Sequence, residues 1–444
     1  MDLVLAGGES QLLESLDFSL KPQANYVQAR FSNTAYPSGA SAFSYYGVRT
    51  SRFTLTASEG GWIDCSTLRL CGTLVNLDGT HPVWPFSPGL HSFIYEMRIL
   101  VAGVEVERLA YYNRTHEMLF NLLQDPGWNQ NEGVEGCRTS SVIPYDNTSA
   151  VIEAGNRLTM MMKPGFGLIL NGGKYLPVKH APITIEITLA NPTDAVHSTL
   201  NTVHASGLPP FDPPASQSYE IQNFKILYDS VMLDSALENS YTAMLLANKS
   251  LTIGYSTWHT TYNSINLGSQ TLALSIVRAC TRLKGIYVTF HTPNANFTSF
   301  AHPSGQQWQP GLVASDLYYA LRDPQLTCQI QVGAKTFPVQ PISSTAEFFE
   351  QLRKIAGCHN QDFRSLSITR SKYESGAFII GMSMERVPGA NAHSGYNTRS
   401  GDLVRIQLTG MAPVTDTGAC DSAYITLWSD QILMISEQGA TVLD

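Results

Sequence analysis

The stretch VAGVEVERLAYYNRTHEMLFNLL, residues 101–123, has the pattern of a strand, a glycine turn, a second strand and a helix. Residues 331–353, QVGAKTFPVQPISSTAEFFEQLR, show the same pattern in the same order. An offset of 230 residues aligns Gly103 with Gly333, Thr115 with Thr345, Glu117 with Glu347 and Leu122 with Leu352. The first stretch is therefore interpreted as one copy of a repeated structural unit.

Three further pairs of segments keep the same order along the chain. These pairs are RLCG (69–72) with RLKG (282–285), the apolar ladder 185–189 with 404–408, and LYDSVML (227–233) with WSDQILM (428–434). Their offsets differ slightly, as expected for a duplicated domain, because loops between strands tolerate insertions. A period of roughly 200 residues is far longer than a solenoid repeat. The sequence thus predicts two similar domains in tandem.

Most of the chain reads as short strands in which apolar and polar residues alternate and which end at Gly, Pro or Asn. The predicted strands are 25–31, 68–76, 93–103, 157–162, 183–190, 219–233, 272–279, 283–291, 328–333, 377–385, 402–410 and 424–435. Strands that are not separated by regular helices favour an all-β sandwich, barrel or jelly roll over a doubly wound α/β fold.

Three isolated helices are predicted, at 115–125, 235–250 and 344–357. Their expected N-terminal caps are Asn113, Ser235 with Glu238, and Ser344 with Glu347. Pro126 is expected to stop the first helix, and Gly357 is a natural residue to end the third.

Charged residues make up 14% of the chain, against about 25% in a typical soluble domain. Such a surface is poorly protected against association, so extensive protein–protein contact is one explanation and a secreted, glycosylated protein is another. The net charge of −8 argues against a surface that wraps nucleic acid, which needs Lys and Arg to replace counterions. No direct sequence-specific binding of nucleic acid is expected.

The seven cysteines are scattered, form no CxxC pair and are interpreted as free thiols in a reducing compartment. They are Cys65, Cys71, Cys137, Cys280, Cys328, Cys358 and Cys420. The N-terminus is acidic where a signal peptide is basic, and no run of 18 apolar residues predicts a transmembrane helix. Without a secretion signal, the four N-x-S/T sequons are interpreted as accidental.

The sequence predicts no catalytic, cofactor-binding or metal-binding residue. The glycine-rich stretch 165–175 lacks the spacing of a phosphate-binding loop, and Tyr175 stands where Ser or Thr would bind Mg²⁺. It is interpreted as a hairpin loop between strands. His180, His197 and His204 are loosely clustered without the spacing of a metal site.

Two carboxylates and one serine are the remaining candidates for catalytic groups. Glu105 and Glu107, at positions i and i+2, are expected to lie on the same face of one strand as surface acids. A glycosidase needs two carboxylates across a cleft, roughly 5–10 Å apart, and the sequence gives no sign of one. Ser41 is interpreted as a loop serine, since no nucleophile-elbow motif surrounds it. A protein of this length without a catalytic constellation is expected to bind or build something.

The repeat also predicts where the domains divide. Residues 205–217 are rich in proline and look like a linker, but the strand that follows them, 219–233, matches the last strand of the chain. The boundary is therefore placed near Asp234, giving domains at 24–234 and 235–444, with 205–217 as the alternative boundary. Residues 1–23 are expected to form an N-terminal arm that orders on assembly.

The two segments YEIQNFKILYDSVMLDSALENSYTAMLLANKSL (219–251) and LALSIVRACTRLKGIYVTFHTP (272–293) complete the pattern. Two β-domains in one chain, joined through an isolated helix, resemble a double jelly-roll major capsid protein of a double-stranded DNA virus. Among such capsid proteins, the layout is most similar to that of polinton-like viruses and virophages, which belong to the lineage of adenovirus hexons. The resemblance covers roughly residues 24–444 and rests on layout, since no invariant motif is present.

The resemblance implies two tandem eight-stranded jelly rolls with a few short helices in loops. It also implies homotrimers with a pseudo-hexameric outline, which tile an icosahedral shell around double-stranded DNA. Neighbouring capsomers, a single jelly-roll penton protein and minor capsid proteins would be the partners, and the virion the location. No enzyme activity and no cofactor are implied. The long loops expected at 34–60, 126–150, 292–325 and 386–401 would form outward towers and interfaces.

Two other functions are left open by the residues alone. A carbohydrate-binding β-sandwich would use aromatic side chains in its loops, and a glycoside-processing enzyme would depend on one essential acid. Whether a membrane lies beneath the shell is also left open.

Overall fold

A computed structural model gives the arrangement of most of the chain. The residues it describes are 26–56, 60–85, 89–123, 135, 151–171, 173–196, 215–266, 269–291, 326–358, 366, 368, 373, 378–386, 395–399, 403–411 and 422–444. The predicted arm 1–23 and most of the loops 126–150, 292–325 and 386–401 lie outside these ranges. The Pro-rich run 205–217 is described only from residue 215.

Two antiparallel sheets are built from strands of the first half of the chain. One has the order β1-β9-β4-β7, with β2 also paired to β9, and the other has the order β3-β8-β5-β6. The bounds are β1 Val27–Ala35, β2 Ala42–Phe43, β3 Thr50–Leu55, β4 Gly61–Asn76, β5 Ile94–Val101, β6 Val104–Ala110, β7 Arg157–Met162, β8 Ile183–Leu189 and β9 Tyr219–Leu233. Buried side chains of both sheets form one hydrophobic core.

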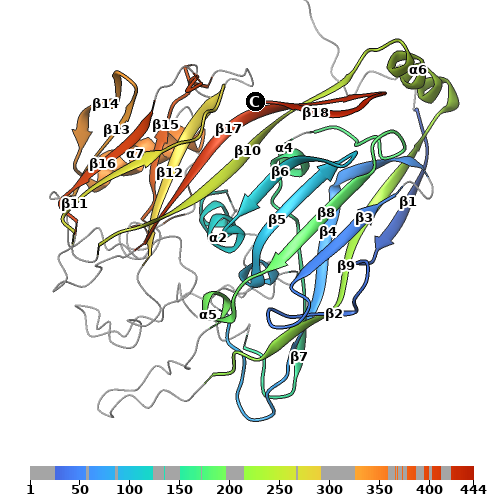
Figure 1. Ribbon diagram of the computed structural model, residues 1–444, viewed down its shortest axis with the longest axis horizontal. Helices are drawn as coiled ribbons and strands as arrows, with labels where there is room; N and C mark the ends of the chain where they lie inside the picture. Colours follow the sequence, from blue (N-terminus) through green and yellow to red (C-terminus); the bar gives the residue numbers. More distant parts are fainter. Residues whose placement is uncertain are drawn as a thin grey trace, which may run out of the picture.

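Two more antiparallel sheets are built from the second half. Their orders are β10-β17-β12-β15, with β18 also paired to β17, and β11-β16-β13-β14. The bounds are β10 Leu251–Ser264, β11 Thr271–Ile276, β12 Leu283–His291, β13 Thr327–Val332, β14 Lys335–Ile342, β15 Ile380–Ser383, β16 Val404–Thr409, β17 Ser422–Ser436 and β18 Gly439–Leu443. A second hydrophobic core lies between these sheets, and the two halves lie side by side in Figure 1.

The two halves have the same topology. When β2 and β18 are set aside, each half pairs its first, eighth, third and sixth strands in one sheet and its second, seventh, fourth and fifth in the other. Two four-stranded antiparallel sheets with these crossovers make a jelly roll. The all-β prediction of two tandem jelly rolls is confirmed.

Each repeated segment also falls on equivalent strands. The glycine turns at Gly103 and Gly333 join β5 to β6 and β13 to β14, and a helix follows each hairpin. The pairs at 69 and 282, 185 and 404, and 227 and 428 fall on β4 and β12, β8 and β16, and β9 and β17. The duplication therefore lies in the framework of strands, as the shared order of the matches indicated.

The strands predicted from alternation are confirmed to within a few residues, except that β4 begins at Gly61, seven residues before the predicted start. In β8 the apolar residues 183, 185, 187 and 189 are buried and the residues between them are partly exposed. Among the described strands, four were not predicted from the sequence: β2, β3, β10 and β18. β2 and β3 lie inside 34–60, so the prediction of one long loop there is wrong.

The helices begin and end close to their predicted bounds, with two wrong caps. α2 (Tyr112–Leu123) begins before Asn113, so Asn113 is a helical residue and not a cap. α6 (Ser235–Leu246) is capped by Asp234, whose side chain accepts from the backbone N of Ala236, and not by Ser235. The cap of α7 (Thr345–Ile355) is confirmed at Ser344, and Gly357 follows the helix with a φ of 73°.

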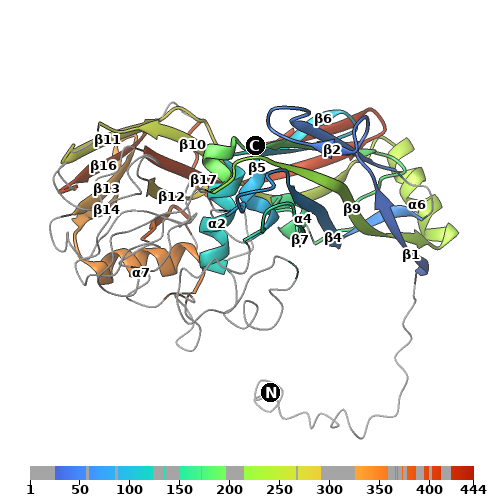
Figure 2. The same cartoon turned by 90° about the horizontal axis from the view of Figure 1, so that it is seen from below.

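Close packing of α7 on the second jelly roll depends on two glycines. A Cβ at Gly285 of β12 would lie 2.3 Å from Ile355, and one at Gly381 of β15 would lie 2.8 Å from Leu352. Because neither strand carries a side chain there, the helix lies directly against them, along one side of the domain in Figure 2. Through this contact the buried side chains of α7 become part of the second hydrophobic core.

Candidate functional site: the junction between the jelly rolls

Two long strands run from one jelly roll into the other. β10 and β17 pair without a break from Leu251↔Ile435 to Ser264↔Ser422. At one end their buried side chains, among them Tyr255 and Leu433, belong to the first core, and at the other end Ile425 and Leu427 belong to the second. Figure 1 shows β10, β17 and β18 extending over the first jelly roll beside β6. The junction is therefore built from sheet and not from a flexible linker.

A β-bulge in β6 determines which side chain enters this junction. Ile99 pairs with Glu107 and Leu100 with Glu105, so Val106 is an extra residue opposite β5. Glu105 stays on the exposed side, where it forms an ion pair with Arg98. Glu107 is buried, with 3% of its surface exposed. The prediction that the two acids share one surface face is wrong, because the bulge shifts the alternation by one residue.

The Glu107 carboxylate joins three elements from both jelly rolls. Its Oε1 accepts hydrogen bonds from the backbone N of Gly167 at 2.8 Å and from Thr257 Oγ1 at 2.6 Å. Its Oε2 accepts from the backbone N of Leu168 at 3.2 Å. Gly167 and Leu168 begin the short helix α4 (Gly167–Asn171), and Thr257 lies in β10. One side chain thus satisfies donors of α4 and of the strand that enters from the second jelly roll.

The helix α4 lies where the sequence predicted a hairpin loop, within 165–175. Its first residue must be glycine, since a Cβ at Gly167 would lie 1.8 Å from the carbonyl oxygen of Ser256 in β10. The glycines of this stretch, which lack the spacing of a phosphate-binding loop, include one that allows two backbones to approach closely. Lys174 lies in the exposed bend that follows α4.

Burial changes the acidity of Glu107. Loss of water around the carboxylate raises its pKa to about 7, although the hydrogen bonds from Thr257, Gly167 and Leu168 oppose this shift. The side chain is therefore poised to gain or lose its proton near neutrality. Its hydrogen-bond partners in the described part of the chain are two backbone amides and a threonine, which do not make a catalytic arrangement.

Further buried hydrogen bonds lie at the junction between the jelly rolls. The hydroxyl of Tyr255 faces two acceptors, the carbonyl oxygen of Val106 at 3.1 Å and Gln431 Oε1 at 2.8 Å. Thr115 of α2 and Thr260 of β10 join their hydroxyls at 2.6 Å. Since these groups are buried, each unmade bond would cost about 1–3 kcal/mol, which favours one fixed orientation of the jelly rolls.

An arginine of α2 also joins the jelly rolls. Arg114 Nη2 donates to Asp194 Oδ1 at 2.7 Å, and Nη1 lies 3.0 Å from Nδ1 of His291, at the end of β12. Its guanidinium carbon lies 5.7 Å from the ring centre of Tyr424 in β17. The charge of Arg114 is therefore held between the first jelly roll and two strands of the second.

The other residues considered from the sequence are not brought together. Ser41 is exposed, His180 is half-buried, and His197 and His204 lie outside the described residues. In the described part of the chain no three His, Cys, Asp or Glu side chains form a group that could hold a metal ion. No described helix is long and apolar enough to cross a membrane. The five described cysteines are free thiols, as predicted.

Sequence reasoning missed Glu107, Gly167 and Thr257 as parts of one site. A signal was present for the bulge, because Val106 and Leu109 are both buried apolar residues of β6 at a spacing of three instead of two. No comparable signal marks Thr257, which lies in a stretch rich in Thr and Ser.

No family model and no curated protein matches the sequence. Solved structures do match it at low identity. The chain is similar to the PBCV-1 virus capsid, at 13% identity with a TM-score of 0.63, covering 96% of this chain and 100% of the other. It is similar to a chain of the Sputnik virophage, at 11% identity with a TM-score of 0.60 and coverages of 98% and 92%.

A third match is the Faustovirus major capsid protein, at 10% identity with a TM-score of 0.58, covering 96% of this chain and 93% of that one. All three likenesses extend over nearly the whole chain and include both jelly rolls and their junction. The chain has the double jelly-roll fold. Its two jelly rolls form one unit in the sense that their cores share the strands β10 and β17.

Proposed function

We propose that the chain is a major capsid protein that acts in the virion as a structural protein and not as an enzyme. The observation that carries the proposal is the pair of jelly rolls with the same strand order, joined through the shared strands β10 and β17. The likeness to capsid structures of PBCV-1, Sputnik and Faustovirus supports it. The weakly charged sequence is suited to a molecule that is surrounded by copies of itself.

The proposed assembly is a homotrimer. Three chains would bring six similar jelly rolls around one axis and give a pseudo-hexameric capsomer, which can occupy six-fold positions of an icosahedral shell. The fixed junction supports this geometry, because a capsomer with a regular outline requires a constant orientation between its two domains. The shell would enclose double-stranded DNA without sequence-specific contacts, as in a polinton-like virus or virophage.

The domain boundaries are also part of the proposal. Residues 24–234 and 235–444 would be the two jelly rolls, with α6 at the start of the second, and residues 1–23 would be an arm on the inner side. β9 pairs with β1 and β4 and ends at Leu233, which supports a boundary near Asp234. Penton and minor capsid proteins would bind at the edges of the capsomer.

Electron microscopy of the purified protein tests the proposal. The expected result is a trimer with a hexagonal outline, together with sheets or shells of such trimers at high protein concentration. A chain that stays monomeric at every concentration and in infected cells would contradict the proposal. A monomer that binds sugars on a glycan array would favour the carbohydrate-binding alternative instead.

A further inference from the structure

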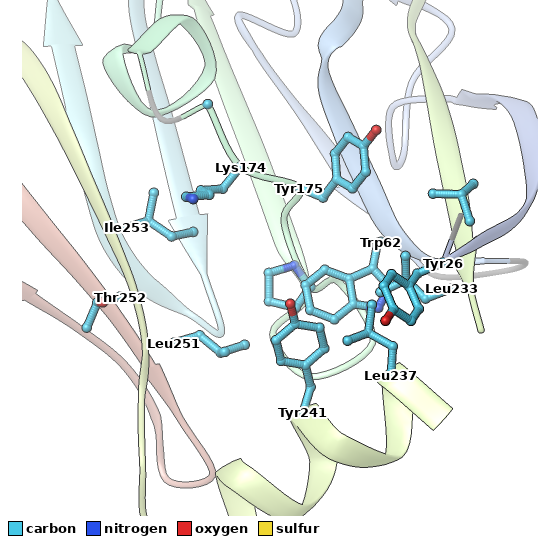
Figure 3. A pocket seen from close by; sticks show the side chains of 13 residues that line it. Tyr26, Trp62, Lys174, Tyr175, Leu233, Leu237, Tyr241, Leu251, Thr252 and Ile253 are labelled. Atoms are coloured by element: carbon cyan, nitrogen blue, oxygen red, sulfur yellow. The ribbon is translucent and has the colours of Figure 1, made fainter. Parts of the chain in front are cut away.

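A cavity of about 490 Å³ lies where the first jelly roll, α6 and the start of β10 meet. Figure 3 shows Trp62, Leu237 and Tyr241 on one side of it and Lys174 and Ile253 on the other. Its volume falls within the roughly 300–1,000 Å³ that small-molecule sites occupy in proteins. The cavity therefore has the size of a ligand site.

Part of the wall of the cavity is an apolar cluster that is separate from both cores. Trp62, Val231 and Leu233 are buried together, and Leu237 and Tyr241 of α6 pack against them. The rings of Trp62 and Tyr241 lie 5.1 Å apart at an angle of 50°. The partly exposed Leu237 and Tyr241 therefore give the cavity an apolar side that a ligand can contact.

The polar side chains among the described lining residues are one lysine, the indole of Trp62 and the hydroxyl-bearing residues Tyr26, Tyr175, Tyr241 and Thr252. Lys174, from the exposed bend after α4, is a lining residue, and no acidic side chain is among the described residues that line the cavity. The buried indole Nε1–H of Trp62 has no hydrogen-bond partner in the described part of the protein. A cation and donors without a carboxylate favour a ligand that carries an anionic head and accepts hydrogen bonds.

We propose that this cavity binds a single-chain amphiphile of the fatty-acid class, with its apolar chain against Trp62 and Leu237 and its carboxylate at Lys174. The lining residues include members of β1, β4 and β9 of the first jelly roll, of the bend after α4, of α6, and of the start of β10. Because β10 continues into the second jelly roll, the ligand would brace the end of the junction that lies beside α6. The inference stands on the cavity and does not depend on assembly into a capsid.

Binding of dodecanoate to the purified full-length chain tests the proposal. Native mass spectrometry is expected to show one dodecanoate per chain, and titration calorimetry gives its affinity. The variant K174M is expected to bind about tenfold more weakly or worse, because a charge-assisted hydrogen bond contributes that much. The variant L237W is expected to weaken binding, since the larger ring would take up part of the space beside Trp62.

Matched controls lie just outside the cavity. Lys249 and Leu246 are exposed residues at the end of α6 that do not line it, so K249M and L246W are expected to bind dodecanoate like the wild type. Thermal unfolding of each variant without ligand checks that it folds.

Four results would overturn the proposal. The first is binding that neither K174M nor L237W changes. The second is equal affinity for dodecanoate and uncharged dodecanol, which would exclude the head-group contact. The third is binding that occurs only after residues 1–23 are removed, because the occupant would then be the N-terminal segment of the chain. Co-sedimentation with phosphatidylglycerol vesicles that persists in L237W, without dodecanoate binding, would likewise assign the interaction to a membrane surface.

Discussion

At Glu107, one extra residue in a strand decides where a carboxylate lies. Without the bulge at Val106, strict alternation would place Glu107 beside Glu105 on the exposed face. With it, the side chain turns into the junction and accepts hydrogen bonds from Gly167, Leu168 and Thr257. The acid therefore has a structural use, which is to hold α4 and β10 against β6.

The pH dependence of stability is expected to report on this one residue. Burial raises the pKa of Glu107 from 4.5 to about 7, so the folded chain holds this proton more tightly than the unfolded chain. The stabilisation is full below the unfolded pKa, declines as the pH rises from about 4.5 to about 7, and is constant above. Between about pH 5 and about pH 8, the free energy of unfolding of the wild type should fall by about 3 kcal/mol more than that of E107Q. Urea titrations at a series of pH values measure both.

The variant E105Q is the matched control for this experiment. It removes a carboxylate two residues away on the exposed side of the bulge, where the partner is Arg98. Its pH profile is expected to follow that of the wild type. If the free energy of unfolding of E107Q also changes with pH as that of the wild type does, Glu107 is not protonated near neutrality in the folded chain, and the prediction is wrong.

Among the elements, those with a regular pattern were predictable and those with an irregular one were not. β8 alternates over its whole length, and its bounds follow from the sequence to within one residue. β10 contains Ser256, Thr257, Thr260 and Thr261 within a few residues of one another, so it reads as a loop although much of it is buried. Thr257 donates a hydrogen bond to Glu107 of the first jelly roll. A local sequence pattern cannot predict a partner that lies 150 residues away in the chain.

The cap of α6 offers a test at the scale of one element. Asp234 accepts from the backbone N of Ala236 and also from Nε2 of Gln28 at 2.9 Å, whereas Ser235, the cap expected from the sequence, is the first helical residue. D234A is therefore expected to lower the free energy of unfolding by about 1 kcal/mol. S235A is expected to change it by less than about 0.5 kcal/mol, as at an ordinary surface site.

Thermal melts of D234A, S235A and Q28A separate the two contacts of the aspartate. Q28A removes only the bond to β1, so a loss in D234A that exceeds the loss in Q28A belongs to the helix cap. Equal melting temperatures for D234A and S235A would contradict the assignment of the cap.

For the whole molecule, the duplication was the most readable feature of the sequence. It survives as shared order among short segments, because strand positions in a jelly roll are fixed by pairing on both sides while loops are free to change. The junction was not predicted, since it depends on Gly167 and on the length of β10, which lie outside the matched segments, and on the bulge at Val106, which breaks the alternation inside one of them. The strand segments shared by the two jelly rolls predicted the fold. The segments that differ between them form the junction that holds the two jelly rolls together.

The proposed trimer requires that the two jelly rolls carry surfaces that bind each other, and this can be tested. In a closed ring, a patch on the first jelly roll of one chain meets a different patch on the second jelly roll of the next chain. Exposed apolar side chains are available on both: Tyr46, 80% exposed, lies between β2 and β3, and Val277, 92% exposed, follows β11. Burial of a large apolar side chain contributes about 1.5–3 kcal/mol.

Y46S and V277S are each expected to raise the concentration at which the trimer half-dissociates by about tenfold or more, because each removes such a contact. Mass photometry over a dilution series measures this concentration. The free energy of unfolding should change by less than about 0.5 kcal/mol, since both side chains are exposed in the single chain. A variant that assembles like the wild type would place its side chain outside the ring contact. If both do so, the ring must close through other faces of the two jelly rolls.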